Sequence, residues 1–324
     1  MAIKIYPEKI EFDDYTLTVT DNGFEFDGDI RTLGRITPAP PMSGTVSGYT
    51  SGGATPFATT IDKFPFATDA NATDVGDLTQ ARAQQAGQSS ETDGYSSGGN
   101  APPFVNTIDK FPFASDANAT DVGDLTQARN NLAGQSSSTD GYSSGGAAPA
   151  IGNIIDKFPF ATDANATDVG DLTQGRYSAA GQSSSTDGYT SGGTPPIVNV
   201  IDKFPFATDA NATDVADLTQ ARSNLSGQSS SDNGYSSGGA TPTRVNTIDK
   251  FPFATDANAT DVGDLSQIRS SVAGQSSSEN GYTSGGFAPP FATTIDKFPF
   301  ATDANATDVG DLTQARSAPA GQQD

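Results

Sequence analysis

The chain has 324 residues, with 17 Lys and Arg against 39 Asp and Glu, and it contains no Cys, His or Trp. Without Cys there is no disulfide, thiolate nucleophile or cysteine-bound zinc, and without His the usual general base near neutral pH is missing. The formal net charge of -22 repels nucleic-acid phosphates and anionic lipids, so we expect no nucleic-acid partner and no membrane insertion.

Residues 1–44 differ in kind from the rest of the chain. Apolar residues alternate at Tyr15, Leu17 and Val19, and the turn Asp21-Asn22-Gly23 follows them, which predicts a β-hairpin. Residues 36–44 are rich in Pro and predict a semi-rigid linker. Because a two-stranded hairpin is marginally stable alone, this segment is expected to pack on the propeller or on a larger assembly. The interpretation that we favour is that residues 1–44 attach the protein to an assembly.

Residues 45–324 form a tandem repeat. The string IDKFPF begins at 61, 108, 155, 201, 248 and 295, and the string GY(S/T)SGG begins at 48, 94, 141, 188, 234 and 281. Each repeat is rich in Gly, Pro, Ser, Thr and Asp, which disfavour helices, and its short apolar runs alternate with turn residues. A spacing of 46 or 47 residues is typical of a four-stranded propeller blade. We therefore predict an all-β fold, a six-bladed β-propeller with a short N-terminal β-hairpin extension.

The apolar content is low for a folded protein. Leu, Ile, Val and Phe make up 57 residues, or 18% of the chain, and composition alone would therefore predict disorder. The phenylalanines are concentrated in the repeat, because 12 of the 19 belong to IDKFPF. Strand alternation places Phe64 and Phe66 on one side of a blade and Ile61 on the other, so a thin core can form between blades.

The two ends of the repeat region are complementary. The first GYTSGG has no IDKFPF before it, and the last IDKFPF has no GY(S/T)SGG after it. Strands from opposite termini would then complete one blade and close the ring. Residues 36–47, which follow the repeat-like Arg35, are a local alternative for the missing strand. Either alternative gives six blades, with residues 1–44 as a separate attachment segment.

The repeat resembles the kelch type. Tyr95 lies before the doublet Gly98-Gly99, and Arg82 lies 16 residues upstream of that doublet, as in kelch repeats. The resemblance covers residues 45–324. The Trp of the kelch pattern is absent, and Val75 and Leu78 are expected to take its packing role.

The repeats IDKFPFATDANATDVGDLTQAR and GYSSGG also resemble kelch-like structural proteins of marine tailed bacteriophages, including cyanophages. This resemblance implies a virion protein that decorates a capsid or tail or attaches to the host. Its partners would be other virion proteins, bound through residues 1–44, and a glycan or protein of the host cell surface.

Calcium is the one candidate cofactor. Oxygen ligands at positions 1, 3, 5 and 9 of the segment DANATDVGD match the spacing of nine-residue calcium loops in integrin-type propellers. In the first two copies these residues are Asp69, Asn71, Thr73 and Asp77, and Asp116, Asn118, Thr120 and Asp124. Position 6 is Asp74, where that motif has Gly. The alternative is a loop whose Asp and Asn side chains cap their own backbone through Asx turns.

An arginine ends the same segment in every repeat, at Arg82, Arg129, Arg176, Arg222, Arg269 and Arg316. These arginines could form an inward ring that binds an anion in the central channel. The interpretation that we favour is a structural ion pair with a carboxylate of the same or the adjacent blade, such as Asp77 and its equivalents.

The copies differ after the Gly doublet and after the arginine. Loops tolerate such variation because packing constrains them least. A partner surface would therefore use the singular residues of these loops, which are Phe57, Phe104, Ile197, Arg244 and Phe291. The alternative is that they seal the seams between blades.

The repeated carboxylates also raise the hypothesis of a glycosidase. Catalysis needs two groups in environments that push their pKa values apart, whereas near-identical blades provide equivalent environments. We therefore expect a non-enzymatic structural or adhesion protein located in a virion. A host-surface or glycan-binding module is the first alternative, and a glycan-active enzyme on a propeller scaffold is the second.

Overall fold

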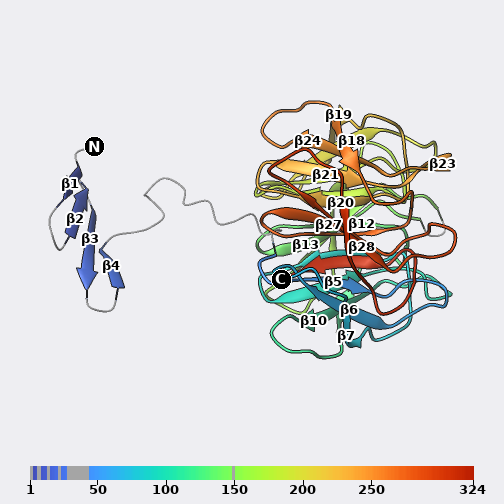
Figure 1. The fold of residues 1–324 in the computed structure, drawn as a ribbon, viewed down its shortest axis with the longest axis horizontal. Helices are drawn as coiled ribbons and strands as arrows, with labels where there is room; N and C mark the ends of the chain where they lie inside the picture. Colours follow the sequence, from blue (N-terminus) through green and yellow to red (C-terminus); the bar gives the residue numbers. More distant parts are fainter. Residues whose placement is uncertain (1–2, 6–8, 13–14, 21–22, 28–43, 148–149) are drawn as a thin grey trace. The chain divides into compact units, whose positions relative to one another are not determined.

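The computed structural model describes residues 3–5, 9–12, 15–20, 23–27, 44–147 and 150–324. The chain divides into two compact units, Met1–Pro38 and Ala39–Asp324. In the described segments, no helix is long and apolar enough to span a bilayer. The second unit is a six-bladed β-propeller, as predicted (Figure 1).

The N-terminal unit contains one antiparallel sheet in which the strands pair in chain order. Its strands are β1 (Ile3–Ile5), β2 (Lys9–Phe12), β3 (Tyr15–Thr20) and β4 (Gly23–Asp27). Strands β3 and β4 lie in the segment where the hairpin was predicted, and β1 and β2 were not predicted. The hairpin extension itself stays a prediction. Apart from Gly44, the predicted Pro-rich linker over 36–44 lies outside the described residues.

Each blade of the propeller is a four-stranded antiparallel sheet. The inner strands, which contact one another around the central axis, are β8 (Ala86–Ser89), β12 (Ala133–Ser136), β16 (Ala180–Ser183), β20 (Ser226–Ser229), β26 (Ala273–Ser276) and β30 (Ala320–Gln323). The second strands are β5 (Ser47–Ser51), β9 (Asp93–Ser97), β13 (Asp140–Ser144), β17 (Asp187–Ser191), β21 (Asn233–Ser237) and β27 (Asn280–Ser284).

The outer half of each blade holds two more strands. The third strands are β6 (Thr60–Pro65), β10 (Thr107–Pro112), β14 (Ile154–Pro159), β18 (Val200–Pro205), β24 (Thr247–Pro252) and β28 (Thr294–Pro299). The outer strands are β7 (Thr73–Asp77), β11 (Thr120–Asp124), β15 (Thr167–Asp171), β19 (Thr213–Asp217), β25 (Thr260–Asp264) and β29 (Thr307–Asp311). One blade also has a two-stranded ribbon of β22 (Ala240–Thr241) and β23 (Thr243–Arg244).

The two termini of the repeat region close the ring. Strand β30 pairs with β5, so that Ala320 lies opposite Ser51 and Gln323 opposite Gly48. The C-terminus accordingly lies beside β5 in Figure 1. The prediction that opposite ends of the chain complete one blade is confirmed. Strand β30 occupies the position for which residues 36–47 were the alternative.

Aromatic side chains fill the outer part of each interface between blades. Tyr142 stacks on Phe206 of the next blade at 4.8 Å between ring centroids and contacts Phe204 at 5.5 Å. Ile155 and Leu172 join this cluster from the same blade as Tyr142. Phe158 of that blade instead packs on Tyr95 of the preceding one, so Ile and Phe face opposite sides, as the alternation predicts.

Hydrogen bonds fill the inner part of each interface. The Nε2 of Gln135 donates to Ser144 Oγ, Tyr189 O and Thr190 Oγ1, each at 2.9 Å. A hydroxyl pair also crosses every interface, namely Ser51–Ser96, Ser97–Ser143, Ser144–Thr190, Ser191–Ser236, Ser237–Thr283 and Ser284–Thr50. The inner layer of each interface is thus polar and hydrogen-bonded across the blades, which explains how so few apolar residues suffice.

Glycine lines the central axis because the inner strands approach within backbone contact. A Cβ atom on Gly134 would lie 2.2 Å from the carbonyl oxygen of Gly87. The same clash recurs at every inner strand, at Gly87, Gly134, Gly181, Gly227, Gly274 and Gly321. Any side chain at this position would push two blades apart.

We predict that Gly134→Ala lowers the free energy of unfolding by about 1–3 kcal/mol, the usual cost of overpacking. The control is Gly152→Ala, because a Cβ there would meet no atom closer than 3.6 Å, and a change within about 0.5 kcal/mol is expected. Urea unfolding followed by circular dichroism measures both. Equal stabilities of the two variants would contradict the close approach at the axis.

We also predict alkaline unfolding that is governed by the buried tyrosines. Burial raises the pKa of Tyr235 to about 12 and that of Tyr282 to about 12, and it raises the pKa of their four equivalents as well. Tyrosines of the unfolded chain ionise near pH 10, so stability is complete below about pH 10 and falls as the pH rises towards 12.

Tyrosinate absorbance should therefore appear together with the loss of sheet signal, since six of the nine tyrosines are involved. Tyr235→Phe should shift the midpoint to higher pH, because it removes one ionisable group whose hydroxyl has no hydrogen-bond partner in the described part of the chain. Ionisation of all tyrosines near pH 10 with the sheet intact would refute the prediction.

Candidate functional site

The repeated arginines form buried ion pairs between consecutive blades. The Nη2 of Arg269, which lies between β25 and β26, is 2.9 Å from Oδ2 of Asp296 on β28 of the next blade. Ser266 also donates to this carboxylate, from its backbone N–H at 2.9 Å and from its hydroxyl at 2.6 Å. Both charged side chains are fully buried, so the charges neutralise each other inside the interface.

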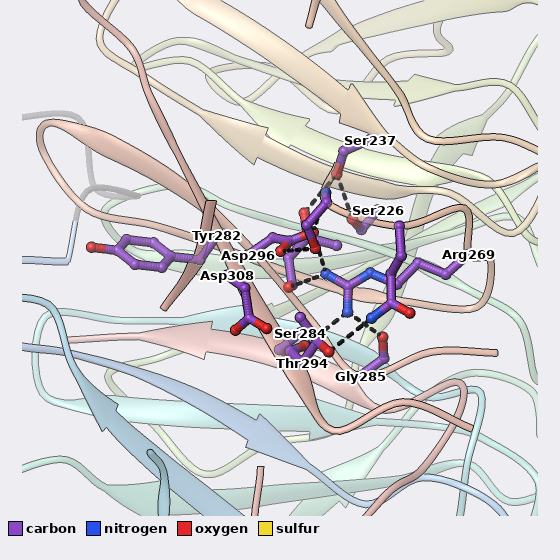
Figure 2. A network of polar contacts seen from close by, with 12 residues as sticks. Ser226, Ser237, Arg269, Tyr282, Ser284, Gly285, Thr294, Asp296 and Asp308 are labelled. Atoms are coloured by element: carbon purple, nitrogen blue, oxygen red, sulfur yellow. Dashed lines mark hydrogen bonds and ion pairs between the residues drawn. The ribbon is translucent and has the colours of Figure 1, made fainter. Parts of the chain in front are cut away.

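Backbone carbonyl oxygens accept further hydrogen bonds from the N–H groups of the same guanidinium. Arg269 Nη1 donates to Gly285 O and Thr294 O, and Nη2 donates to Thr283 O, each at 2.8 Å (Figure 2). Burial lowers the pKa of Arg269, and Asp296 raises it. The guanidinium therefore links the connector to two strands of the next blade.

The ion pair recurs at all six interfaces, and each guanidinium also donates to at least one backbone carbonyl of the next blade. The pairs are Arg82–Asp109, Arg129–Asp156, Arg176–Asp202, Arg222–Asp249, Arg269–Asp296 and Arg316–Asp62. The carboxylate belongs to IDKFPF of the next blade and not to Asp77 or its equivalents, which the sequence analysis named as partners. Because the guanidinium groups are buried between blades, the structure does not place them as a ring in the channel.

The loop with the sequence DANATD, which lies between the third and the outer strand, binds the outer part of the preceding blade. We call this contact the clasp. The Oδ1 of Asn305 accepts a hydrogen bond from the backbone N–H of Asp264 at 3.1 Å, and Ala306 N–H donates to Asp264 O at 2.8 Å. Lys250 of that blade pairs with Asp303 at 2.5 Å. Side chains of the loop thus hold the outer strand β25 of the neighbouring blade.

The candidate calcium ligands of the first copy have separate partners in this clasp. Asp69 pairs with Lys297, and Asn71 Oδ1 accepts the N–H of Asp311 at 3.1 Å. Thr73 Oγ1 lies 3.5 Å from the carbonyl oxygen of Lys63, and Asp77 Oδ1 accepts the hydroxyl of Thr59 at 2.5 Å.

In the second copy, Asp116 pairs with Lys63 at 3.3 Å and Asn118 accepts the N–H of Asp77 at 3.1 Å. Thr120 and Asp124 begin and end β11. Within the described ranges, no group of three or more acidic side chains is arranged to hold a metal ion. Calcium binding by these loops stays a prediction from sequence.

The alternative interpretation was a loop whose side chains cap their own backbone. Such a cap occurs at Asp74, which is not one of the four candidate calcium ligands. The N–H of Gly76 donates to Asp74 Oδ1 at 3.3 Å, which is an Asx turn. Asp74 is the residue that departs from the calcium motif. The clasp of Asn71 on the preceding blade was not predicted, because its partner lies outside its own repeat.

The candidate partner residues share one position, the fourth residue before the Ile of IDKFPF in each repeat. Phe57, Phe104 and Ile197 are 38%, 41% and 37% exposed. The sequence analysis missed their equivalent Ile151, which is 44% exposed and which counting back four residues would have found. We call the six residues at this position the crown, namely Phe57, Phe104, Ile151, Ile197, Arg244 and Phe291.

Arg244 makes the crown asymmetric. Its guanidinium lies over the ring of Phe287 at 4.1 Å from the centroid, and that ring contacts Phe291 at 5.0 Å. The ribbon β22–β23 carries Arg244 in this blade. Within residues 44–147 and 150–324, every other Arg and Lys is in an ion pair, whereas Arg244 has no carboxylate partner.

The crown lies on what we call the connector face of the propeller. This face is built from the loops between second and third strands and from the connectors between blades, since backbone bridges such as Ala83–Asn100 and Ala54–Ser317 join the two kinds of segment. Its described residues are 52–59, 78–85, 98–106, 125–132, 145–147, 150–153, 172–179, 192–199, 218–225, 238–246, 265–272, 285–293 and 312–319. None of them is Asp or Glu. Asp77 and its equivalents end the outer strands beside this face.

The opposite side, which we call the acidic face, holds the loops between inner and second strands and between third and outer strands. Antiparallel strands place these two loops at the same end of a blade. Its carboxylates include Asp69, Glu91, Asp116, Asp163, Asp209, Asp232, Asp256, Glu279, Asp303 and Asp324. The two faces of the propeller therefore differ strongly in charge.

A closed ring of backbone hydrogen bonds surrounds the axis at the connector face. Each N–H donates to the carbonyl oxygen of the equivalent residue in the preceding blade at 2.7–2.9 Å. The six residues have left-handed backbone angles and are Gln84, Asn131, Ser178, Asn224, Ser271 and Ala318. The cavity that they line has a volume of about 70 Å³, far below the 300 Å³ or more of ordinary ligand sites.

Comparison with known proteins identifies no family for this chain. A scan of protein-family models and a search of curated proteins each found no match.

We predict that Arg269→Met costs about 3–5 kcal/mol of folding free energy, because it leaves the buried Asp296 carboxylate uncompensated. The control is Lys250→Met, which breaks an exposed pair with Asp303 and should cost about 1 kcal/mol or less. Urea unfolding measures both variants.

Arg269→Met combined with Asp296→Asn should cost less than the sum of the two single changes, because the uncompensated charge is gone. Equal costs for the buried and the exposed pair, or strict additivity in the double variant, would contradict the role given to Arg269.

Proposed function

We propose that the protein is a non-enzymatic structural or adhesion component of a phage particle. In this proposal the propeller is a rigid body, and residues 1–44 attach it to a capsid, neck or tail protein. The phage assignment rests on the resemblance of the repeats to structural proteins of marine tailed phages, and the kelch assignment rests on the Tyr, Gly-Gly and Arg pattern.

The observation that carries the non-enzymatic proposal is the sixfold repetition of the charged groups. The pairs of Arg with Asp and of Lys with Asp each recur at six interfaces. Acid–base catalysis needs two groups whose environments differ, and in the described ranges these carboxylates hold blades together in equivalent environments. A polysaccharide-hydrolase screen should be blank.

The rigidity that the proposal needs comes from closure and from the density of contacts between blades. The last connector places Arg316 against Asp62 of the first blade at 2.9 Å, and β30 pairs with β5. No blade is left with an unsupported interface, unlike the ends of an open repeat array.

A second candidate function is a host-surface or glycan-binding module. The observation in its favour is the exposure of Phe57 and Phe104 on loops whose sequence varies between repeats. Aromatic side chains on a solvent-exposed surface are typical anchors for partners.

We predict that deletion of residues 1–44 abolishes incorporation into particles while the purified propeller still folds. Quantitative mass spectrometry of purified particles measures incorporation, and circular dichroism checks folding. The control is Phe57→Ser combined with Phe104→Ser in the full chain, which should still be incorporated and should lose cell binding if the crown recognises the host. Normal incorporation of the truncated protein would refute attachment through residues 1–44.

A further inference from the structure

We propose that two copies of this chain associate face to face through their connector faces, with the crown residues at the centre of the contact. The first support is the distribution of exposed apolar side chains. Among the described residues, six large apolar side chains are exposed, and five of them lie on the connector face, namely Phe57, Phe104, Ile151, Ile197 and Ile268. The sixth, Val46, lies on the acidic face. Exposed apolar side chains that gather on one side of a protein, and are not scattered over its surface, favour an interaction site there.

The second support is charge, which decides which partner fits. With a net charge of -22, two copies repel each other wherever their carboxylates face. The segments of the connector face contain no Asp or Glu, and its nearest carboxylates, Asp77 and its equivalents, lie at the rim, where the outer strands end. The middle of this face is therefore the surface through which identical copies can approach. The small volume of the axial cavity, about 70 Å³, favours a flat protein surface over a sugar or another small ligand as the occupant.

The third support is symmetry. The crown residues occupy one equivalent position in each blade, so two facing rings can match residue by residue in an isologous contact. The aromatic and aliphatic members of one ring then meet those of the other. Arg244 adds an interface anchor without requiring a carboxylate, since a guanidinium that already covers Phe287 can stack on an aromatic ring of the second copy.

The first residues of the propeller that the structure describes lie away from the crown. Residues 1–43 join the propeller at Gly44, whose N–H donates to Ser276 O, and Val46 N–H donates to Asp324 O. These contacts lie on the acidic face, opposite the crown.

Sedimentation velocity of the full chain tests the association. At about 100 μM, where a complex of micromolar affinity is formed, the mass should be twice the 33.2 kDa of the chain. The association should strengthen between about 0.05 and 0.5 M NaCl, because salt screens the repulsion between acidic copies. Phe57→Ser combined with Phe104→Ser should weaken it about tenfold or more, whereas Val46→Ser on the acidic face should not change it.

A second measurement locates the contact. The chain has no Cys, so a single introduced Cys reports one position. Ser271→Cys, beside the axis on the connector face, should form a disulfide-linked dimer under mild oxidation, and Thr45→Cys on the acidic face should not.

A monomer at every salt concentration would overturn the proposal. So would a dimer that the crown variants leave unchanged, or one that is crosslinked through position 45, because association would then use another surface. The measurement needs no particle, so its failure is distinguishable from a failure of attachment through residues 1–44.

Discussion

The buried ion pair between each connector and the next blade is the interaction on which the propeller depends. Arg269 and Asp296 are both fully buried, and burying two charges is costly unless hydrogen bonds satisfy them. Here the carboxylate accepts from Ser266 and the guanidinium donates to three carbonyls. These bonds can form together in only one relative position of the connector and the next blade. The ion pair therefore fixes the position of every blade against its neighbour.

The part of the core near the axis is polar because the blades lie very close together there. Around the axis the blades approach so closely that Gly134 faces the carbonyl of Gly87, and large apolar side chains have no room there. Short hydroxyl side chains and one Gln per blade fill this layer and satisfy one another across the interface. The apolar residues are placed further out, where Tyr142 packs on Phe206. A chain whose overall composition is typical of disordered proteins can therefore form a closed fold, because its few apolar residues are concentrated in the outer layer of the interfaces.

The sequence predicted the fold more fully than the site. Repeat spacing and the complementary ends predict six blades and closure, because both depend on order along the chain. The predicted structural ion pair of Arg269 with a carboxylate of the adjacent blade is present, but the carboxylate is Asp296 of IDKFPF and not an equivalent of Asp77, which was the example given. A signal was present, since an Asp between Ile and Phe in all six copies of IDKFPF must be buried and needs a cation. The clasp of Asn71 was missed because it binds a neighbouring blade.

The two faces differ because their loops make contacts with different parts of the chain. On the connector face, Ala83 and Asn100 exchange backbone hydrogen bonds, and the axial ring is likewise a backbone ring, so these contacts depend less on the identity of the side chain. On the acidic face, the side chains of Asn118 and Asp116 themselves bind the preceding blade, so their identity is constrained by packing. Variation between repeats therefore collects on the connector face without loss of stability. A surface with this freedom can acquire the crown and a single Arg244 while the scaffold beneath it stays sixfold.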